Sequence, residues 1–256
     1  MKRNVEKLQK KVSQGKRLSI KDVSEAIASA PLLYQPGTHW HYGISADVLG
    51  MIVSVISGKS LSEFMSQEIF EPLGMRDTGF LIPEEKKNRL ATMYTLKDDC
   101  VIPADEKRLR EIFRHGVTDE VPFEAGGSGL YSTIEDYALF TECLLQQGSL
   151  KERRILGRKT VEFMRSNQLT SEQIKDITME HAYGYGYGSL MRVLMDKTPQ
   201  GTNGSIGEYG WDGMAGSYFL IDPEEQLVVI YMQQVAEGQD ESMRRKLRQI
   251  IYGAIE

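Results

Sequence analysis

Residues 209–234 read YGWDGMAGSYFLIDPEEQLVVIYMQQ. β-Branched and aromatic residues fill 216–221 and 227–232, and the turn-forming run Asp222-Pro223-Glu224-Glu225 separates them, so this pattern predicts two strands joined as a hairpin. Segments of similar texture at 183–193 and 206–211 predict further strands. We therefore expect an antiparallel sheet toward the end of the chain.

Helical periodicity precedes this sheet. Apolar residues at helical spacing predict a helix over 45–57, and Gly58 supplies a natural end. Ser19 is a candidate N-cap for a helix over 21–30, and Ser60 with Glu63 forms a capping box for the next helix. Further helices are predicted near the start of the chain, after Ser132, over 159–166 and over 240–255. Helices, then strands, then one helix indicate an α+β fold.

The composition excludes several classes of protein. The chain has 256 residues, 41% hydrophobic and 26% charged, with a formal net charge of −5, which gives no electrostatic footprint for nucleic acid or anionic lipid. The longest apolar run, 48–56, is far shorter than the roughly 18 residues of a membrane span. The basic cluster Arg244, Arg245, Lys246 and Arg248 is interpreted as a solvated helix face.

Neither cysteine has a disulfide-type or zinc-type spacing, and Cys143 falls in an apolar helical pattern that predicts burial. The basic N-terminus has no apolar segment of a secretory signal, so a cytoplasmic location is expected.

Three local patches invite a chemical interpretation. His39-Trp40-His41-Tyr42 offers imidazoles for a metal and a phenol for acid/base work, but no third ligand is evident, so no metal is expected. Residues 126–129 form a Gly-rich turn that matches neither a phosphate loop nor a nucleophile elbow. Residues 210–217 interrupt a strand with glycines, which marks the close approach of a ligand or of another backbone and is one way to build an oxyanion hole.

Four segments in order resemble one family. They are PLLYQPGTHWHYGISADVLG (31–50), SGKSLSEFMSQEIFEPLGMRDTGF (57–80), AGGSGLYSTIEDYALFTECLLQQGSL (125–150) and residues 209–234. Together they resemble the serine β-lactamase and penicillin-binding-protein superfamily, and within it the class C-like family VIII carboxylesterases. The resemblance covers most of the chain from about residue 20. It implies an antiparallel sheet flanked by helices plus a helical lobe, in a single domain over 1–256 with the lobe at about 20–180 and the sheet with its closing helix at 181–256.

The resemblance also implies a chemistry and its residues. The family transfers acyl groups through a covalent acyl-serine and needs no cofactor. Tyr42 matches the family's general-base tyrosine, with Ile44 in place of the asparagine of β-lactamases, which favours an esterase-like activity. Trp211-Asp212-Gly213 matches the strand that shapes the substrate edge, and the backbone N–H of Met214 would then donate to the oxyanion.

The family's nucleophile motif, Ser-x-x-Lys, is the exception. Its one formal match is Ser13-Gln14-Gly15-Lys16, a poor candidate because Gly15 weakens a helix, the surroundings are basic, and the distance to Tyr42 is much shorter than the family's. The nucleophile is therefore unassigned, and we expect the family's N-terminal portion to be missing from this sequence.

Three hypotheses follow. The first is a truncated serine hydrolase for small esters or related amides, inactive as this chain. The second is a non-catalytic binding module or pseudoenzyme. The third is one half of a split enzyme whose partner chain holds the serine. No nucleic-acid or membrane partner is expected, and an exposed apolar surface left by the missing portion would favour self-association.

Overall fold

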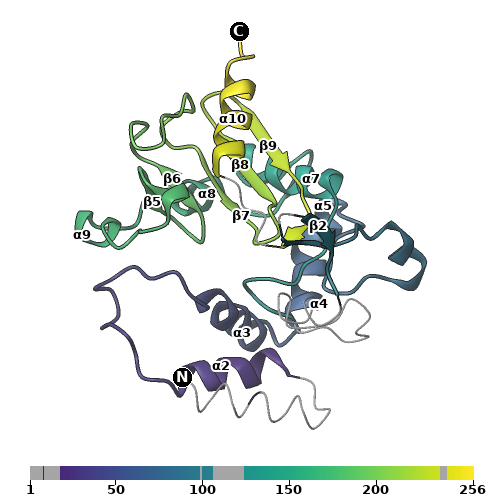
Figure 1. Cartoon of the computed structure of the whole chain (residues 1–256). Coiled ribbons are helices and arrows are strands. Elements are labelled where there is room, and N and C mark those ends of the chain that lie inside the picture. The colour runs from purple at the N-terminus through teal and green to yellow at the C-terminus, as the bar shows by residue number, and fades with distance from the viewer. Residues whose placement is uncertain (1–7, 9–17, 99, 106–123, 237–240) are drawn as a thin grey trace. The chain divides into compact units, whose positions relative to one another are not determined.

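The computed structural model describes residue 8 and residues 18–98, 100–105, 124–236 and 241–256. The chain divides into two compact units. Unit 1 comprises Met1–Pro36, Tyr42–Leu90 and Asp105–Thr133, and unit 2 comprises Gly37–His41, Ala91–Ala104 and Ile134–Glu256. Figure 1 shows both units, with helices and strands labelled where there is room.

Unit 1 is helical. In chain order it contains α2 (Ile20–Ala28), α3 (Ser45–Ser57), α4 (Leu61–Met65), the π-helical turn η1 (Ser66–Phe70), α5 (Glu71–Leu73) and the 3-10 helix η2 (Glu84–Arg89). Ser19 and Ser60 each form a capping box, with Asp22 and Glu63 respectively. Gly58 ends α3 in the left-handed conformation. The predicted helix over 45–57 and both predicted N-caps are confirmed, whereas the helix expected near the start of the chain lies almost entirely outside the described residues.

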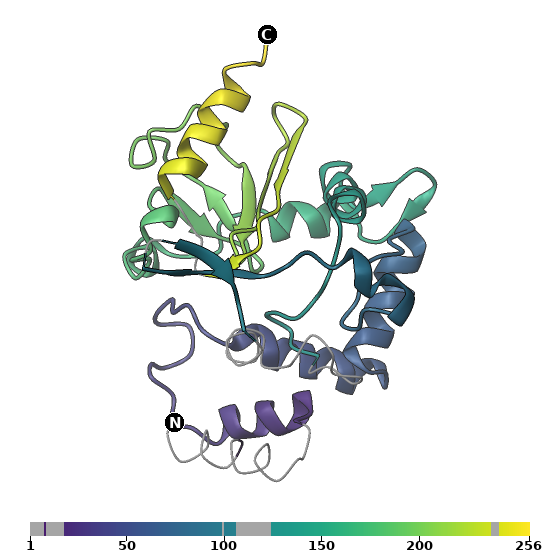
Figure 2. The ribbon, with the colours of Figure 1, turned by 45° about the vertical axis from the view of Figure 1, so that its right-hand side comes forward.

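Helices α2 and α3 pack side by side (Figures 1 and 2). Their close approach depends on Gly50, because a Cβ at that position would lie 2.9 Å from Cδ1 of Ile20 and 3.2 Å from Cα of Gly126. Val23 and Ala125 are buried in the small apolar cluster beside this contact. The Gly-rich turn at 126–129 is thus part of the packing of α3.

Unit 2 holds the sheet. In chain order it contains β1 (Tyr94–Lys97), β2 (Cys100–Pro103), α7 (Ile134–Leu145), β3 (Ser149–Leu150), β4 (Arg153–Arg154), α8 (Arg158–Met164), α9 (Ser171–Ile174), η3 (Glu180–Ala182), β5 (Tyr185–Tyr187), β6 (Arg192–Leu194), β7 (Tyr209–Asp212), β8 (Tyr218–Asp222), β9 (Leu227–Tyr231), β10 (Val235–Ala236) and α10 (Glu241–Tyr252). Strands β5 to β9 form an antiparallel sheet in chain order, and a smaller sheet has the order β10-β1-β2.

Strand alternation buries both faces of the large sheet. Ile221 of β8 packs with Leu144 of α7 on one face, and Tyr218 and Leu220 of β8 pack with Tyr252 of α10 on the other. This pattern follows the two-residue period of a strand, in which successive side chains point to opposite faces. The predicted hairpin around Asp222-Pro223 and the predicted closing helix are both present.

Two expectations need correction. The segment 183–193, expected as one strand, contains β5 and the start of β6, joined by a turn in which Leu190 has a φ of 60°. The expected boundary near residue 180 also differs, because α7 packs on β8 and β9 and so α7, α8 and α9 belong with the sheet in unit 2. Helical periodicity located these helices but carried no information about which element they cover.

Among the described residues no single helix is both long and apolar enough to cross a membrane. Helix α3 and the segment Leu61–Leu73 pass that test of length and composition only as a pair bent by 78°.

Cys143 is 2% exposed on α7, which confirms its predicted burial, and this burial raises the pKa of its thiol.

Candidate active site

The loop between β7 and β8 presents a backbone donor. It is closed by the N–H of Gly213, which donates to the carbonyl of Ser217 over 2.8 Å, and by the N–H of Gly216, which donates to the carbonyl of Gly213 over 3.0 Å. Gly216 has a φ of 94°, a left-handed conformation that glycine adopts without strain. Met214 is the second residue of the turn that begins at Gly213, and within the described part of the chain its N–H donates to no acceptor. The N–H is therefore available to a ligand.

The glycines that interrupt β7 have a packing role. A Cβ on Gly210 would lie 2.1 Å from the carbonyl oxygen of Phe219 and 2.9 Å from Cα of Leu220, so the β8 backbone occupies that space. A Cβ on Gly213 would meet the hydroxyl of Ser217 at 2.1 Å. Close approach of another backbone, one of the two interpretations of the motif, thus accounts for Gly210.

Trp211 stands in an aromatic group within unit 2. Its ring meets the ring of Tyr187 edge-on at a centroid distance of 5.4 Å, and Tyr187 meets Trp40 in the same way at 5.3 Å. The backbone N–H of Trp40 donates to Asp176 over 2.9 Å, and Nδ1 of His39 lies 3.1 Å from the same carboxylate. The N–H of Trp40, with His39 beside it, holds the pKa of Asp176 below its usual range. Residues 39–40 are therefore tied to the Trp211 strand.

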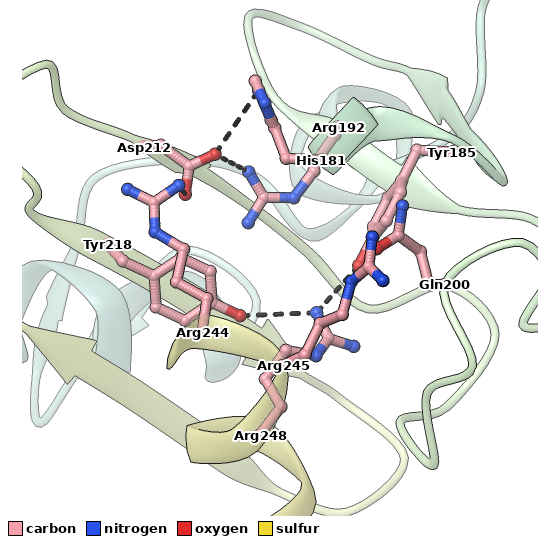
Figure 3. A pocket seen from close by; sticks show the side chains of 9 residues that line it. All are labelled: His181, Tyr185, Arg192, Gln200, Asp212, Tyr218, Arg244, Arg245 and Arg248. Atoms are coloured by element: carbon pink, nitrogen blue, oxygen red, sulfur yellow. Dashed lines mark hydrogen bonds and ion pairs between the residues drawn. The ribbon is translucent and has the colours of Figure 1, made fainter. Parts of the chain in front are cut away.

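Asp212 points into a buried charged group, shown in Figure 3. Its carboxylate pairs with the guanidinium of Arg192, lies 3.1 Å from Arg244 and 3.7 Å from Nε2 of His181, and its side chain is 3% exposed. Burial opposes the charge of Arg192, but the Asp212 carboxylate outweighs it and raises the pKa of that guanidinium. Burial lowers the pKa of His181, and Asp212 offsets part of that effect. The carboxylate expected at the substrate edge is thus engaged in internal ion pairs.

The solvated face expected for the basic cluster on α10 is wrong for two of its members. Arg244 and Arg248 are only 4% and 7% exposed. Arg248 lies 2.7 Å from the carboxylate of Glu208, which is itself 1% exposed, and Arg244 faces Asp212. Lys246 is exposed, as expected, and Arg245 is partly exposed. Buried carboxylates on the sheet account for the two arginines, since buried charges are paired.

Tyr42 lies in unit 1, three residues before α3 begins, and is 56% exposed. The first turn of α3 is anchored close by: the buried carboxylate of Asp47 accepts the N–H of Gly127 over 3.1 Å. A Cβ on Gly126 would lie 1.9 Å from the carbonyl oxygen of Ala46, so only glycine fits there. The first turn of α3 and the Gly-rich turn at 126–129 are therefore in contact within unit 1.

The structure brings together Trp211, Asp212, Gly213 and Met214 in unit 2, and describes Tyr42 in unit 1. Ser13 lies outside the described residues. The described part of the chain contains no group of three or more His, Cys, Asp or Glu side chains arranged to hold a metal ion.

Sequence reasoning missed Asp47, Asp176 and Arg192 as residues that fix these segments. The only local signal was an acidic residue in the first turn of a helix at Asp47, since the partners of Asp176 and Arg192 are far away in sequence.

Residues 3–252 match the family model described as Beta-lactamase. The sequence is 33% identical over 213 residues to Protein Rv1367c of Mycobacterium tuberculosis (strain ATCC 25618 / H37Rv). The aligned region covers 81% of this chain and 51% of that protein. It is also 27% identical over 238 residues to esterase EstB of Burkholderia gladioli, and this alignment covers 88% of this chain and 57% of the esterase.

Among solved structures, EstCE1, described as a hydrolase with promiscuous acyltransferase activity, matches with a TM-score of 0.79 and 24% identity. The match covers 92% of this chain and 62% of that one. This likeness concerns the fold alone. The chain spans about half the length of the curated relatives it matches.

Proposed function

The chain belongs to the beta-lactamase family, and from that premise we propose that it serves serine-based acyl transfer on small esters or related amides. Its fold is the expected α+β fold of β-lactamases and transpeptidases, with helices and an antiparallel sheet. The observation that carries the proposal is the β7–β8 loop, in which the N–H of Met214 is presented next to Trp211 and Gly213. Ile44, in place of the asparagine of β-lactamases, supports an esterase rather than a β-lactamase.

The proposed reaction has two stages. Tyr42, in its phenolate form, accepts the proton of a serine hydroxyl as the serine oxygen attacks the ester carbonyl, and the carbonyl oxygen becomes an oxyanion. The N–H of Met214, with the serine's own N–H, donates to that oxyanion. The carbon–oxygen bond to the alcohol then breaks, the alcohol takes the proton, and an acyl-serine remains. A water molecule next attacks the acyl-serine, which releases the acid and regenerates the serine.

The nucleophilic serine of this reaction is not assigned to a residue of the chain. The 256 residues contain one Ser-x-x-Lys, at 13–16, and Gly15 within it disfavours the helix on which the motif works. We propose that the serine is supplied by a Ser-x-x-Lys segment other than residues 13–16, outside the 256 residues, and that residues 18–256 carry the base, the substrate edge and one oxyanion donor. On this proposal the described residues are inactive without that segment.

A second candidate function is a binding module or one half of a split enzyme. The surface of α3 favours it, because Leu49, Ile52, Val55 and Ile56 are between 46% and 81% exposed on that one helix. Exposed apolar surface of this kind is typical of a protein contact, either with a partner chain or with a second copy.

The test combines labelling with turnover. The purified 256-residue chain is exposed to a fluorophosphonate, its intact mass is measured, and hydrolysis of p-nitrophenyl acetate is followed alongside. We expect neither an adduct nor turnover from the folded chain. An adduct mapped to Ser13, lost in Ser13→Ala and accompanied by turnover, would place the nucleophile within this sequence and contradict the external supply.

The complementary experiment supplies the proposed serine on a second polypeptide. A separate polypeptide carrying a Ser-x-x-Lys motif, taken from the part of a relative that this chain does not span, is mixed with the chain. Labelling of the added serine and turnover, both dependent on the chain, would support the hydrolase. A complex without labelling or turnover would favour the binding module. The matched control is the same polypeptide with its serine changed to alanine.

A further inference from the structure

A small pocket of unit 2 is rich in arginine. It is lined by side chains from α10, η3 and strands β5 to β8, and by Gln200 from the segment between β6 and β7 (Figure 3). Four of its lining residues are arginines, Arg192, Arg244, Arg245 and Arg248, and one is a carboxylate, Asp212. The other ionisable lining groups are the imidazole of His181, whose burial favours its neutral form, and two tyrosines. The lining is therefore strongly positive.

The surrounding acids are already engaged. Glu208 lies 2.7 Å from Arg248 and also accepts hydrogen bonds from Tyr185 and Tyr252. Glu180 lies 3.0 Å from Arg245. Asp212 faces both Arg192 and Arg244, so one carboxylate serves two guanidinium groups that are each about 95% buried. In surroundings of low dielectric constant, such a lining attracts an anion strongly.

One donor in this lining has no protein acceptor. The Nε of Arg245 is buried and, among the residues that the structure describes, it has no hydrogen-bond partner, although the other end of its guanidinium pairs with Glu180. A buried, unsatisfied N–H on a charged group is costly, and native structures supply it with an acceptor. The pocket is the space into which an acceptor would fit.

We propose that this pocket binds a small inorganic anion of the halide type, with Arg245 as a direct donor. The free space is close to that of a single water molecule, which suits a monatomic anion better than a phosphate or a carboxylate. The anion offsets the excess of guanidinium groups over carboxylates in the pocket lining and fills the acceptor position at Arg245. Because α10 supplies three of the arginines and β7 supplies Asp212, the bound anion stabilises the contact between this helix and the sheet. The proposal does not depend on the hydrolase function.

The first test is a chloride titration of the full chain at constant ionic strength, with gluconate as the replacement anion and the melting temperature read by circular dichroism. A ligand that binds only the folded state raises the melting temperature saturably. In Arg245→Gln we expect the chloride concentration at half-effect to rise about tenfold or more, because a hydrogen bond to a charged group is lost. Arg153→Gln, an exposed arginine on β4 with the same change of charge, is the control and should respond as the unmodified chain does.

A melting temperature that does not depend on chloride at constant ionic strength would overturn the proposal, as would equal responses of the two variants. The second test is direct. Crystals soaked in bromide should show an anomalous-scattering peak within hydrogen-bonding distance of Nε of Arg245. A water molecule in that position, with no bromide, would contradict the proposed anion.

Discussion

Trp211 and Tyr42, the two aromatic residues proposed to face a substrate, stand in different surroundings. Trp211 is enclosed within unit 2, where Tyr187 and His181 contact its ring edge-on and the guanidinium of Arg192 lies 5.9 Å from the ring centroid. Tyr42 is 56% exposed in unit 1, in the segment that leads into α3. We infer that the contacts around Trp211 both hold the sheet residues in position and stabilise the fold. Because Tyr42 is more than half exposed, its substitution should change the free energy of unfolding little.

The largest effect should come from Tyr42→Phe, which removes the proposed base and leaves the ring. With the Ser-x-x-Lys polypeptide added to make the chain active, we expect kcat for p-nitrophenyl acetate to fall by about 10²- to 10⁴-fold, because the base is lost. The melting temperature of the chain should be nearly unchanged. Tyr34→Phe, an exposed tyrosine in the same unit, is the control. A fall in kcat no greater than that of the control would remove Tyr42 from the mechanism.

Met214→Pro tests the oxyanion donor without removing a side-chain hydrogen bond. Proline deletes the N–H and suits the second position of the turn that starts at Gly213, so the loop should persist. We expect kcat to fall by about 10²- to 10³-fold, as for the loss of one oxyanion donor. Met214→Ala keeps the N–H and should lie within a few-fold of the unmodified protein. Equal kcat values for the two variants would show that this N–H does not act on the oxyanion.

Glycine substitutions compare the packing of the two regions directly. Gly126→Ala and Gly210→Ala each force a Cβ against a carbonyl oxygen, at 1.9 Å and 2.1 Å, and should reduce the free energy of unfolding by about 3 kcal/mol. Gly127→Ala and Gly157→Ala meet only ordinary contacts and are the matched controls. Urea denaturation measures all four variants. If Gly126→Ala matched Gly127→Ala, the tight contact with α3 would be disproved.

The smallest effect concerns pH and His181. Its pKa is lowered in the folded chain by burial, whereas the unfolded chain takes up that proton at a pH of about 6.5. Below pH 6.5 the unfolded state therefore binds more protons, and folding stability declines as the pH falls toward the folded pKa. His181→Gln should lose less stability than the unmodified chain between pH 7.5 and 5.5, as measured by urea denaturation at each pH.

Local chemistry made much of the fold predictable. The helix over 45–57, its end at Gly58, and the caps at Ser19 and Ser60 depend on residues within a few positions of one another. The hairpin at Asp222-Pro223 follows from turn residues between two apolar runs. The assignment of α7 to the sheet was not predictable in this way, because Leu144 meets Ile221 only after the chain has folded.

The candidate residues divide along the same line. Family resemblance pointed to Tyr42 and to the segment 211–214, and their catalytic roles remain proposals. Sequence alone gave no sign that Asp212 would be enclosed by Arg192 and Arg244, because those partners come from a neighbouring strand and from a helix about thirty residues further along the chain.

What the sequence determined by itself is the order of elements, their caps and turns, and membership of a family whose segments it carries in the same order. The tertiary structure decided which charged residues are buried. Arg244 and Arg248 are four positions apart on α10, a spacing equally compatible with a face in water and with a face on buried carboxylates. The carboxylates of Asp212 and Glu208 on the sheet determine that this face is buried, because a guanidinium is buried only where an opposite charge pairs with it.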